Sequence, residues 1–248
     1  MTCWFEGPLA AFGTGATGTD VEEDRILSGA LVVQETAGAR PRVTRWLVDP
    51  GVPVPEAAIA AHGLTEDLLH RNGRWPAPVM AEMAGALGRQ CASGRPLVVM
   101  DAPFGLTLLD RELRRHRASS LPAHLEGAPL CVLDPRVLDG QLDRYRKGPR
   151  ALRDLRDHYK AEAAGPDDVD GVEPTALSAL AALEVVRAVG RRFSARLERL
   201  SARELHGLQT RWHAELARGQ QSWFSRPAES GPEAAAWPLR PPRSAAAA

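Results

Sequence analysis

The order of the short apolar runs along the chain is the sequence feature that most constrains its fold. Apolar runs at residues 8–12, 25–33 and 43–48 are separated by turns rich in Gly and Pro. Two later runs, residues 96–100 and 130–133, are each followed by a helical pattern. Runs of this length indicate buried strands, which pair antiparallel across a short loop and lie parallel when a helix joins them. We therefore predict an α/β fold with a mixed five-stranded sheet flanked by helices.

The sequence as a whole divides into three parts. We expect a domain over residues 1–192, in which Thr65 caps a short helix with Glu66 and Asp67 in its first turn. Helical spacing predicts a C-terminal helical extension over residues 193–225. Residues 226–248 consist mainly of Pro, Ala, Gly and Ser, a composition that predicts a disordered tail.

Composition excludes several classes of protein. The 31 Lys and Arg residues balance 31 Asp and Glu residues, so any binding of nucleic acid must use a local patch. The cysteines, Cys3, Cys91 and Cys131, lie far apart and predict reduced thiols rather than a disulfide or a zinc site. The chain has no apolar stretch that would span a membrane and no signal-peptide pattern. We therefore expect a cytoplasmic protein without a membrane partner.

Several segments, taken in their order along the chain, carry a resemblance to a known family. They are Phe12-Gly13-Thr14-Gly15-Ala16-Thr17-Gly18, Asp24-Arg25-Ile26, Ala61-His62-Gly63-Leu64-Thr65, Asp101-Ala102-Pro103-Phe104-Gly105 and Glu173-Pro174-Thr175-Ala176-Leu177-Ser178-Ala179. Each match is weak alone, but the ordered set is fairly specific. The chain resembles the DnaQ-like 3′–5′ exonucleases of the DEDDh group over about residues 4–192. This resemblance implies a ribonuclease H-like fold.

The resemblance also locates the positions that the family uses for hydrolysis. Its members hold two Mg or Mn ions with four carboxylates and deprotonate a water with a histidine. The corresponding residues here are Gly13, Gly15, Gly105 and Ser178 for the carboxylates and Glu173 for the histidine. Glycine has no side chain to offer a metal, and a serine offers only a neutral hydroxyl. We therefore predict a degenerate exonuclease that retains no catalytic residue, binds no metal and needs no cofactor.

Nearby acidic residues leave an enzymatic alternative open. Asp101 ends its strand, and Asp167, Asp168 and Asp170 lie in the loop before Glu173. Together these carboxylates would support a residual or metal-shifted 3′–5′ exonuclease with a single weak cation site. A solvated loop that caps the next helix is the favoured interpretation of the three loop aspartates.

Two groups of residues are candidates for weak contacts with DNA or RNA. Thr14, His62 and Phe104 lie in segments that line the nucleotide pocket in the family. A structural role is favoured for His62 and is at least as well supported for Phe104. The second group is a basic run made of Arg144, Arg146, Lys147 and Arg150, with Tyr145 among them. Cations interleaved with an aromatic residue are typical of nucleic-acid surfaces. Interspersed aspartates favour a solvated helical surface instead.

The helical extension offers a protein-binding alternative. Trp212, Leu216 and Trp223 form a stripe within residues 205–224. Such a stripe is a packing face if the domain covers it and a partner-binding face if it does not. Three hypotheses therefore remain: a non-catalytic nucleic-acid-binding or scaffold protein, a residual exonuclease, and a protein-binding module.

Overall fold

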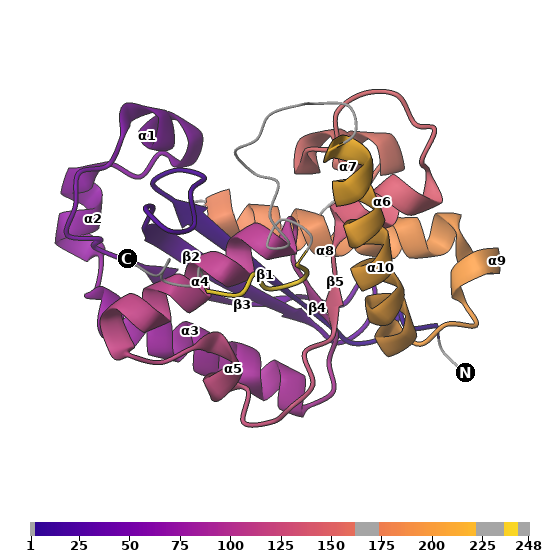
Figure 1. Ribbon diagram of the computed structural model, residues 1–248, viewed down its shortest axis with the longest axis horizontal. Coiled ribbons are helices and arrows are strands. Elements are labelled where there is room, and N and C mark those ends of the chain that lie inside the picture. The colour runs from indigo at the N-terminus through magenta and orange to yellow at the C-terminus, as the bar shows by residue number, and fades with distance from the viewer. Residues whose placement is uncertain (1–2, 162–173, 222–235, 243–248) are drawn as a thin grey trace.

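A five-stranded sheet forms the centre of the protein (Figure 1). The computed structural model describes residues 3–161, 174–221 and 236–242. The strands are β1 (Leu9–Ala16), β2 (Ile26–Gln34), β3 (Arg42–Leu47), β4 (Leu97–Val98) and β5 (Val132–Leu133), in the order β3-β2-β1-β4-β5. β2 pairs antiparallel with β1 and β3, whereas β4 pairs parallel with β1 and β5. The mixed sheet expected from the order of apolar runs is therefore confirmed.

Helices cover both faces of this sheet (Figure 1). On one side lie α3 (Pro76–Ala92), α4 (Ala102–Arg117) and α5 (Leu121–His124), and on the other α6 (Pro135–Leu142), α7 (Leu152–Tyr159) and α8 (Pro174–Arg192). Two short helices, α1 (Glu56–His62) and α2 (Glu66–Asn72), connect β3 to α3, and α9 (Ser194–Leu197) and α10 (Ala202–Gln221) follow α8. No helix among the described residues is long and apolar enough to cross a bilayer.

Alternation along β1 produces two apolar layers. Ala10 and Phe12 belong to the layer shared with α3 and α4, whereas Leu9 and Ala11 belong to the layer shared with α8. Successive side chains of a strand point to opposite faces, so β1 contributes to both layers. β2 is buried along its whole length. The centre of the sheet is therefore the core of the protein. The site described below lies where the central strands β1 and β4 end.

Hydrogen bonds from two side chains fix the starts of α2, α4 and α6. Thr65 Oγ1 accepts a hydrogen bond from Leu68 N at 3.2 Å, which confirms the predicted cap. Asp134 caps α6 by accepting from Arg136 N at 2.9 Å, and it also accepts from Ala102 N at 2.9 Å at the start of α4. Burial raises the pKa of the Asp134 carboxyl to about 6. One buried carboxyl group therefore joins the starts of α4 and α6 beside the carboxyl ends of β4 and β5.

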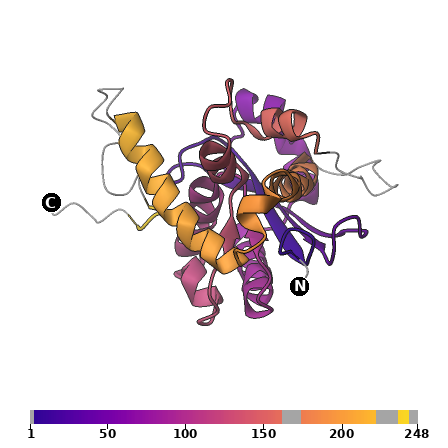
Figure 2. The ribbon, with the colours of Figure 1, turned by 90° about the vertical axis from the view of Figure 1, so that its right-hand side faces the viewer.

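The helical extension completes the edge of the sheet (Figure 2). α10 packs against β5, and its residues Leu205 and Gln209 are buried. The Gln209 side chain accepts from Asp134 N at 2.8 Å and donates to Val132 O at 3.1 Å. These bonds satisfy backbone groups of an otherwise open edge strand. The described part of α10 is therefore integral to the packing of the domain.

Residues 236–242 depart from the disordered tail expected for residues 226–248. The Trp237 side chain is only 6% exposed and contacts the His206 ring at a centroid distance of 4.9 Å. Arg240 N donates to Thr107 Oγ1 at 3.0 Å, and the Pro241 carbonyl accepts from Arg111 at 2.6 Å. Composition alone favours disorder here, but burial of one large aromatic side chain supplies a tertiary anchor that composition does not reveal.

We expect Trp237→Ala to lower the free energy of unfolding by roughly 1.5–3 kcal/mol, the value of burying one large apolar side chain. The matched control is Trp75→Ala, because Trp75 is 74% exposed and its loss should change stability by less than about 0.5 kcal/mol. Urea denaturation measures both variants. Equal stabilities of the two variants would show that residues 236–242 contribute nothing to the fold.

Candidate functional site

A cavity of about 280 Å³ opens where the ends of β1 and β4 meet α4, α7 and α8. It is lined by three residues at which the resemblance places replaced metal ligands and by three candidates for nucleotide contacts: Gly13, Gly105 and Ser178, and Thr14, His62 and Phe104. They come from four separate segments of the chain. The structure therefore brings these positions together, including Ser178, whose position in the motif depended on the loop before it.

Gly15 lies beside this cavity, in a space that other side chains already fill. A Cβ atom at Gly15 would lie 2.6 Å from Ser28 Oγ and 3.2 Å from Thr175 Oγ1. These two hydroxyl groups are buried and hydrogen-bonded to each other at 2.6 Å. Any side chain at position 15 therefore requires the Ser28 hydroxyl to move. A neutral hydroxyl pair occupies the space from which the family's second carboxylate would extend.

The other two glycines differ in the room that surrounds them. A Cβ atom at Gly13 would lie 3.3 Å from the Thr175 carbonyl oxygen and 3.5 Å from Ala179 Cβ, because α8 approaches β1 closely. A Cβ atom at Gly105 would make ordinary contacts, 3.6 Å from Val99 Cγ1 and 3.7 Å from Thr14 Oγ1. Position 105 accepts a side chain as it stands, whereas position 13 accepts one only after a small shift of α8.

The side chains around the cavity do not suit a pair of divalent ions. Mg and Mn need several carboxylate oxygens, yet the described lining residues include no Asp or Glu. Thr14, Thr175 and Ser178 supply only hydroxyl groups, and His62 supplies one imidazole. Across the described residues, no group of three or more His, Cys, Asp or Glu side chains is arranged to hold a metal. The described part of the site thus lacks a ligand set for two-metal hydrolysis.

Asp101, the first residue of the enzymatic alternative, is engaged elsewhere. Its carboxylate pairs with Arg136 at 2.8 Å and is 43% exposed, and it is not among the residues that line the cavity. An arginine therefore balances its charge. Glu173 and the loop aspartates, Asp167, Asp168 and Asp170, lie outside the described residues, so their part in a residual site stays a prediction.

His62 adds no charge to the cavity at neutral pH. The residue ends α1 and is half-buried against the end of β1. Burial lowers the pKa of its imidazole, and a hydrogen bond with the Ala16 backbone opposes this effect only in part. The ring is therefore neutral at pH 7 and offers hydrogen bonds to a ligand without electrostatic attraction.

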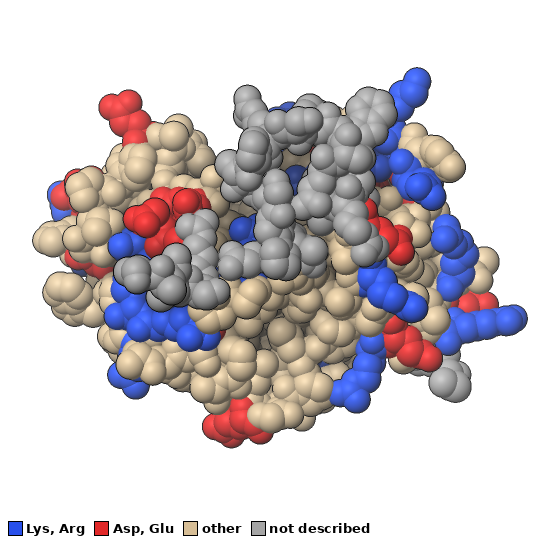
Figure 3. Space-filling view, viewed as in Figure 1, with Lys and Arg blue, Asp and Glu red and all other residues tan. Residues whose placement is uncertain are grey.

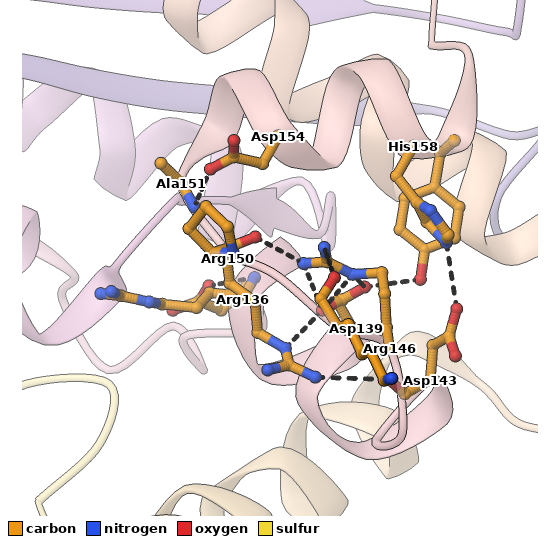
Figure 4. A network of polar contacts seen from close by, with 12 residues as sticks. Arg136, Asp139, Asp143, Arg146, Arg150, Ala151, Asp154 and His158 are labelled. Atoms are coloured by element: carbon orange, nitrogen blue, oxygen red, sulfur yellow. Dashed lines mark hydrogen bonds and ion pairs between the residues drawn. The ribbon is translucent and has the colours of Figure 1, made fainter.

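The basic run in the loop before α7 is divided into inward and outward side chains. Figure 4 shows the inward pair, Arg146 and Arg150. Asp139 of α6 is fully buried and accepts hydrogen bonds from Arg146 Nε at 3.0 Å, Arg150 Nε at 2.6 Å and the Tyr159 hydroxyl at 2.8 Å. Only 8% of the Arg146 side chain is exposed. Arg146 and Arg150 thus join α6 to the loop before α7. That they also contact nucleic acid stays a prediction, and their first role is structural.

The outward members of the run are Arg144, Tyr145 and Lys147. All three are exposed, and the Arg144 guanidinium lies 5.6 Å from the centre of the Tyr145 ring. Lys and Arg side chains gather at the edge of the molecule beside α6 and α7 (Figure 3). The sequence analysis placed Tyr145 among these cations, and the structure shows its ring exposed beside Arg144.

The one stripe residue whose side chain the structure describes, Trp212, packs against the domain. It is half-buried against both main apolar clusters, and Leu205, earlier on α10, is buried. Trp223 and the side chain of Leu216 lie outside the described residues. The described face of α10 is therefore a packing face, and a protein partner bound through residues 205–224 stays a prediction.

Comparisons with known proteins agree with this architecture. No protein-family model matches the chain. Over 88 residues the chain is 38% identical to a DNA polymerase III subunit epsilon-like protein of Rhodobacter capsulatus. That match covers 36% of this chain and 11% of the relative's length.

Solved structures of exonucleases share the fold. Exonuclease X in complex with 5′ overhanging duplex DNA matches with a TM-score of 0.54 at 16% identity, over 81% of this chain and 99% of that one. Exonuclease I from Methylocaldum szegediense gives a TM-score of 0.58 at 16% identity, over 86% and 45% of the two chains. E. coli Exonuclease I in complex with a dA16 oligonucleotide gives 0.59 at 12% identity, over 77% and 42%. The expected ribonuclease H-like fold is confirmed.

We expect Asp139→Ala to destabilise the protein by about 3–5 kcal/mol, because it leaves the buried Arg146 guanidinium without its carboxylate and removes the acceptor of Arg150 and of the Tyr159 hydroxyl. Asp157→Ala is the matched control, since Asp157 is 62% exposed and lies 3.7 Å from Arg156, a surface pair worth less than about 1 kcal/mol. Urea denaturation compares the two variants. A loss below 1 kcal/mol for Asp139→Ala would contradict the structural role of Arg146 and Arg150.

Proposed function

We propose that this chain, a DnaQ-like 3′–5′ exonuclease in family and fold, binds nucleic acid without hydrolysing it. The observation that carries the proposal is the composition of the cavity wall. Gly13, Gly105 and Ser178 meet there, and each stands where the resemblance expects a metal-binding carboxylate. No carboxylate replaces them among the described lining residues.

The residues around Gly15 also support the absence of a metal site, in addition to the replaced ligand positions themselves. Metal-binding carboxylates crowd together and repel one another when no metal is bound. Here the buried hydroxyl groups of Ser28 and Thr175 bond to each other at the corresponding place. A satisfied neutral pair needs no metal to be stable in a buried site. The proposal therefore needs no divalent ion to stabilise this part of the fold.

Binding of nucleic acid is supported by the groups that the cavity retains. Thr14 offers a hydroxyl, His62 an imidazole and Phe104 an aromatic ring, all suited to contacts with sugars and bases. Among proteins of similar fold, Exonuclease X is seen with duplex DNA and E. coli Exonuclease I with an oligonucleotide. Because this chain has no net charge, we expect binding to be weak. Because contacts of the basic run with phosphates release counterions, we expect this binding to fall steeply with salt.

The first test compares binding with hydrolysis on the same substrates. We expect labelled single-stranded DNA and RNA to bind at low salt and to keep their length with Mg or Mn present, because the described site has no ligand set for the metal pair. Denaturing gels follow the 3′ end. Metal-dependent trimming that survives repurification and disappears in Asp101→Ala would contradict the proposal and favour the residual exonuclease.

A restored variant tests whether the replaced positions converge on one metal site. It carries Gly13→Asp, Gly15→Glu, Gly105→Asp, Ser178→Asp and Glu173→His, together with Ser28→Ala to remove the hydroxyl that obstructs position 15. We expect Mn to raise its melting temperature, since an ion bound only to the native state stabilises it. A gain of 1 kcal/mol corresponds to about 2–4 °C for a chain of this size.

The control for the restored variant has the same shape without the charge. It carries Gly13→Asn, Gly15→Gln, Gly105→Asn and Ser178→Asn, with Glu173→His and Ser28→Ala retained. We expect no Mn-dependent shift in this amide variant, because amides are poor replacements for carboxylates around hard cations. If both variants fold and show the same response to Mn, the four positions do not form a metal site and the assignment of the cavity fails.

A further inference from the structure

We propose that Tyr145 is a stacking platform for a base of single-stranded nucleic acid, with Arg144 and Lys147 binding the adjoining phosphates. The inference rests on the proposed function and deepens it by naming the contact surface and the strand type. It assigns direct contact to the outward residues of the basic run. Arg146 and Arg150 are positioning residues, because they act through Asp139.

The exposure of Tyr145 is the first observation. At 87%, it is the most exposed of the large hydrophobic side chains in the described part of the protein. A ring in this position contributes little to the apolar core. Its ring contact is with the Arg144 guanidinium, at 5.6 Å from the ring centre. The ring is therefore accessible to a flat ligand.

The turn that carries Tyr145 is held on both sides. Arg146 N donates to the Asp143 carbonyl at 3.0 Å, and the Arg146 side chain reaches buried Asp139 (Figure 4). The Asp143 carboxylate contacts His158 Nε2 at 3.0 Å, and its carbonyl accepts from Arg150 at 3.3 Å. A turn fixed before binding loses little conformational entropy when a ligand arrives. The protein thus presents an exposed ring on a preorganised support.

The charge around the ring suits a polyanion. Residues 139–160 contain seven Lys and Arg side chains but four Asp side chains, in a chain without net charge. Asp139 and Asp143 are engaged within the network, and Asp154 accepts from Ala151 N at the start of α7 at 3.0 Å. In the described part of the chain, no ion pair joins Arg144 or Lys147 to a carboxylate. These two cations are available to phosphates.

The ring selects single strands over duplexes. Bases in a duplex are stacked on one another, whereas an unpaired base has a free face for an aromatic side chain. A protein partner would need a larger contiguous apolar face than one tyrosine between cations provides. The same loop continues into α7, whose first residue, Leu152, lines the cavity. The loop that carries the platform therefore leads directly into a helix whose first residue lines the cavity.

Fluorescence anisotropy with labelled oligo-dT at low salt tests the platform. We expect Tyr145→Ala to weaken binding about tenfold, the effect of losing one stacked base, and Tyr145→Trp to preserve binding. Trp75→Ala is the matched control, because Trp75 is also exposed, at 74%, but lies outside the basic run, and its loss should leave binding unchanged. A duplex of the same sequence should bind more weakly and should not distinguish the Tyr145 variants.

The outcomes separate this inference from the proposed function. If the wild-type protein binds oligo-dT and Tyr145→Ala binds equally well, the platform is overturned while binding of nucleic acid stands. If the wild-type protein does not bind at low salt, both are overturned. Urea denaturation shows whether each variant is folded, and Tyr145→Ala should keep the wild-type midpoint because its ring lies outside the core. If Tyr145→Ala has the wild-type midpoint of urea denaturation but binds oligo-dT more weakly, and Trp75→Ala binds as the wild type does, the platform is supported.

Discussion

The close approach of α8 to β1 is the contact on which the rest of the structure depends. At the cavity end, a Cβ atom at Gly13 would lie 3.3 Å from the Thr175 carbonyl oxygen, so the absence of a side chain lets the helix lie directly on the strand. Farther along α8, fully buried Arg187 donates to Gln34 Oε1 at 2.8 Å and to the Gly7 carbonyl at 3.0 Å. A buried guanidinium needs such acceptors. α8 is thus fixed to β1 at its first turn and to β2 and the N-terminal segment farther along.

The same proximity decides what the cavity can contain. Thr175 and Ser178 lie in the first turns of α8, facing the end of β1 where the family's first two carboxylates would stand. Carboxylates at those positions would need either a metal or a wider gap to relieve their repulsion. Small residues and a hydroxyl pair need neither. The small residues at the end of β1 and the tight packing of α8 are therefore two aspects of one arrangement.

How far the sequence predicts this protein depends on the range of each interaction. The mixed five-stranded sheet was predictable, because the apolar runs and their connections are local in the sequence. The cavity was predictable as a set of positions through the ordered motifs. The Ser28–Thr175 pair was not, since its members are 147 residues apart and neither hydroxyl stands out. Trp237 was assigned to a disordered tail because its anchor, the His206 ring on α10, is visible only in the packed structure.

The basic run shows the same limit most clearly. Sequence alone gives alternating charges over residues 139–160 and cannot tell which cations turn inward. The answer depends on Asp139, whose burial requires α6 and α7 to pack together and whose carboxylate then draws in Arg146 and Arg150. Arg146 and Arg150 fix the loop before α7, whereas the side chains of Arg144 and Lys147 remain exposed. In a chain without net charge, long-range attraction contributes little to binding. The recognition of nucleic acid that we propose therefore depends on a few contacts held in fixed geometry, which the buried carboxylate of Asp139 supports.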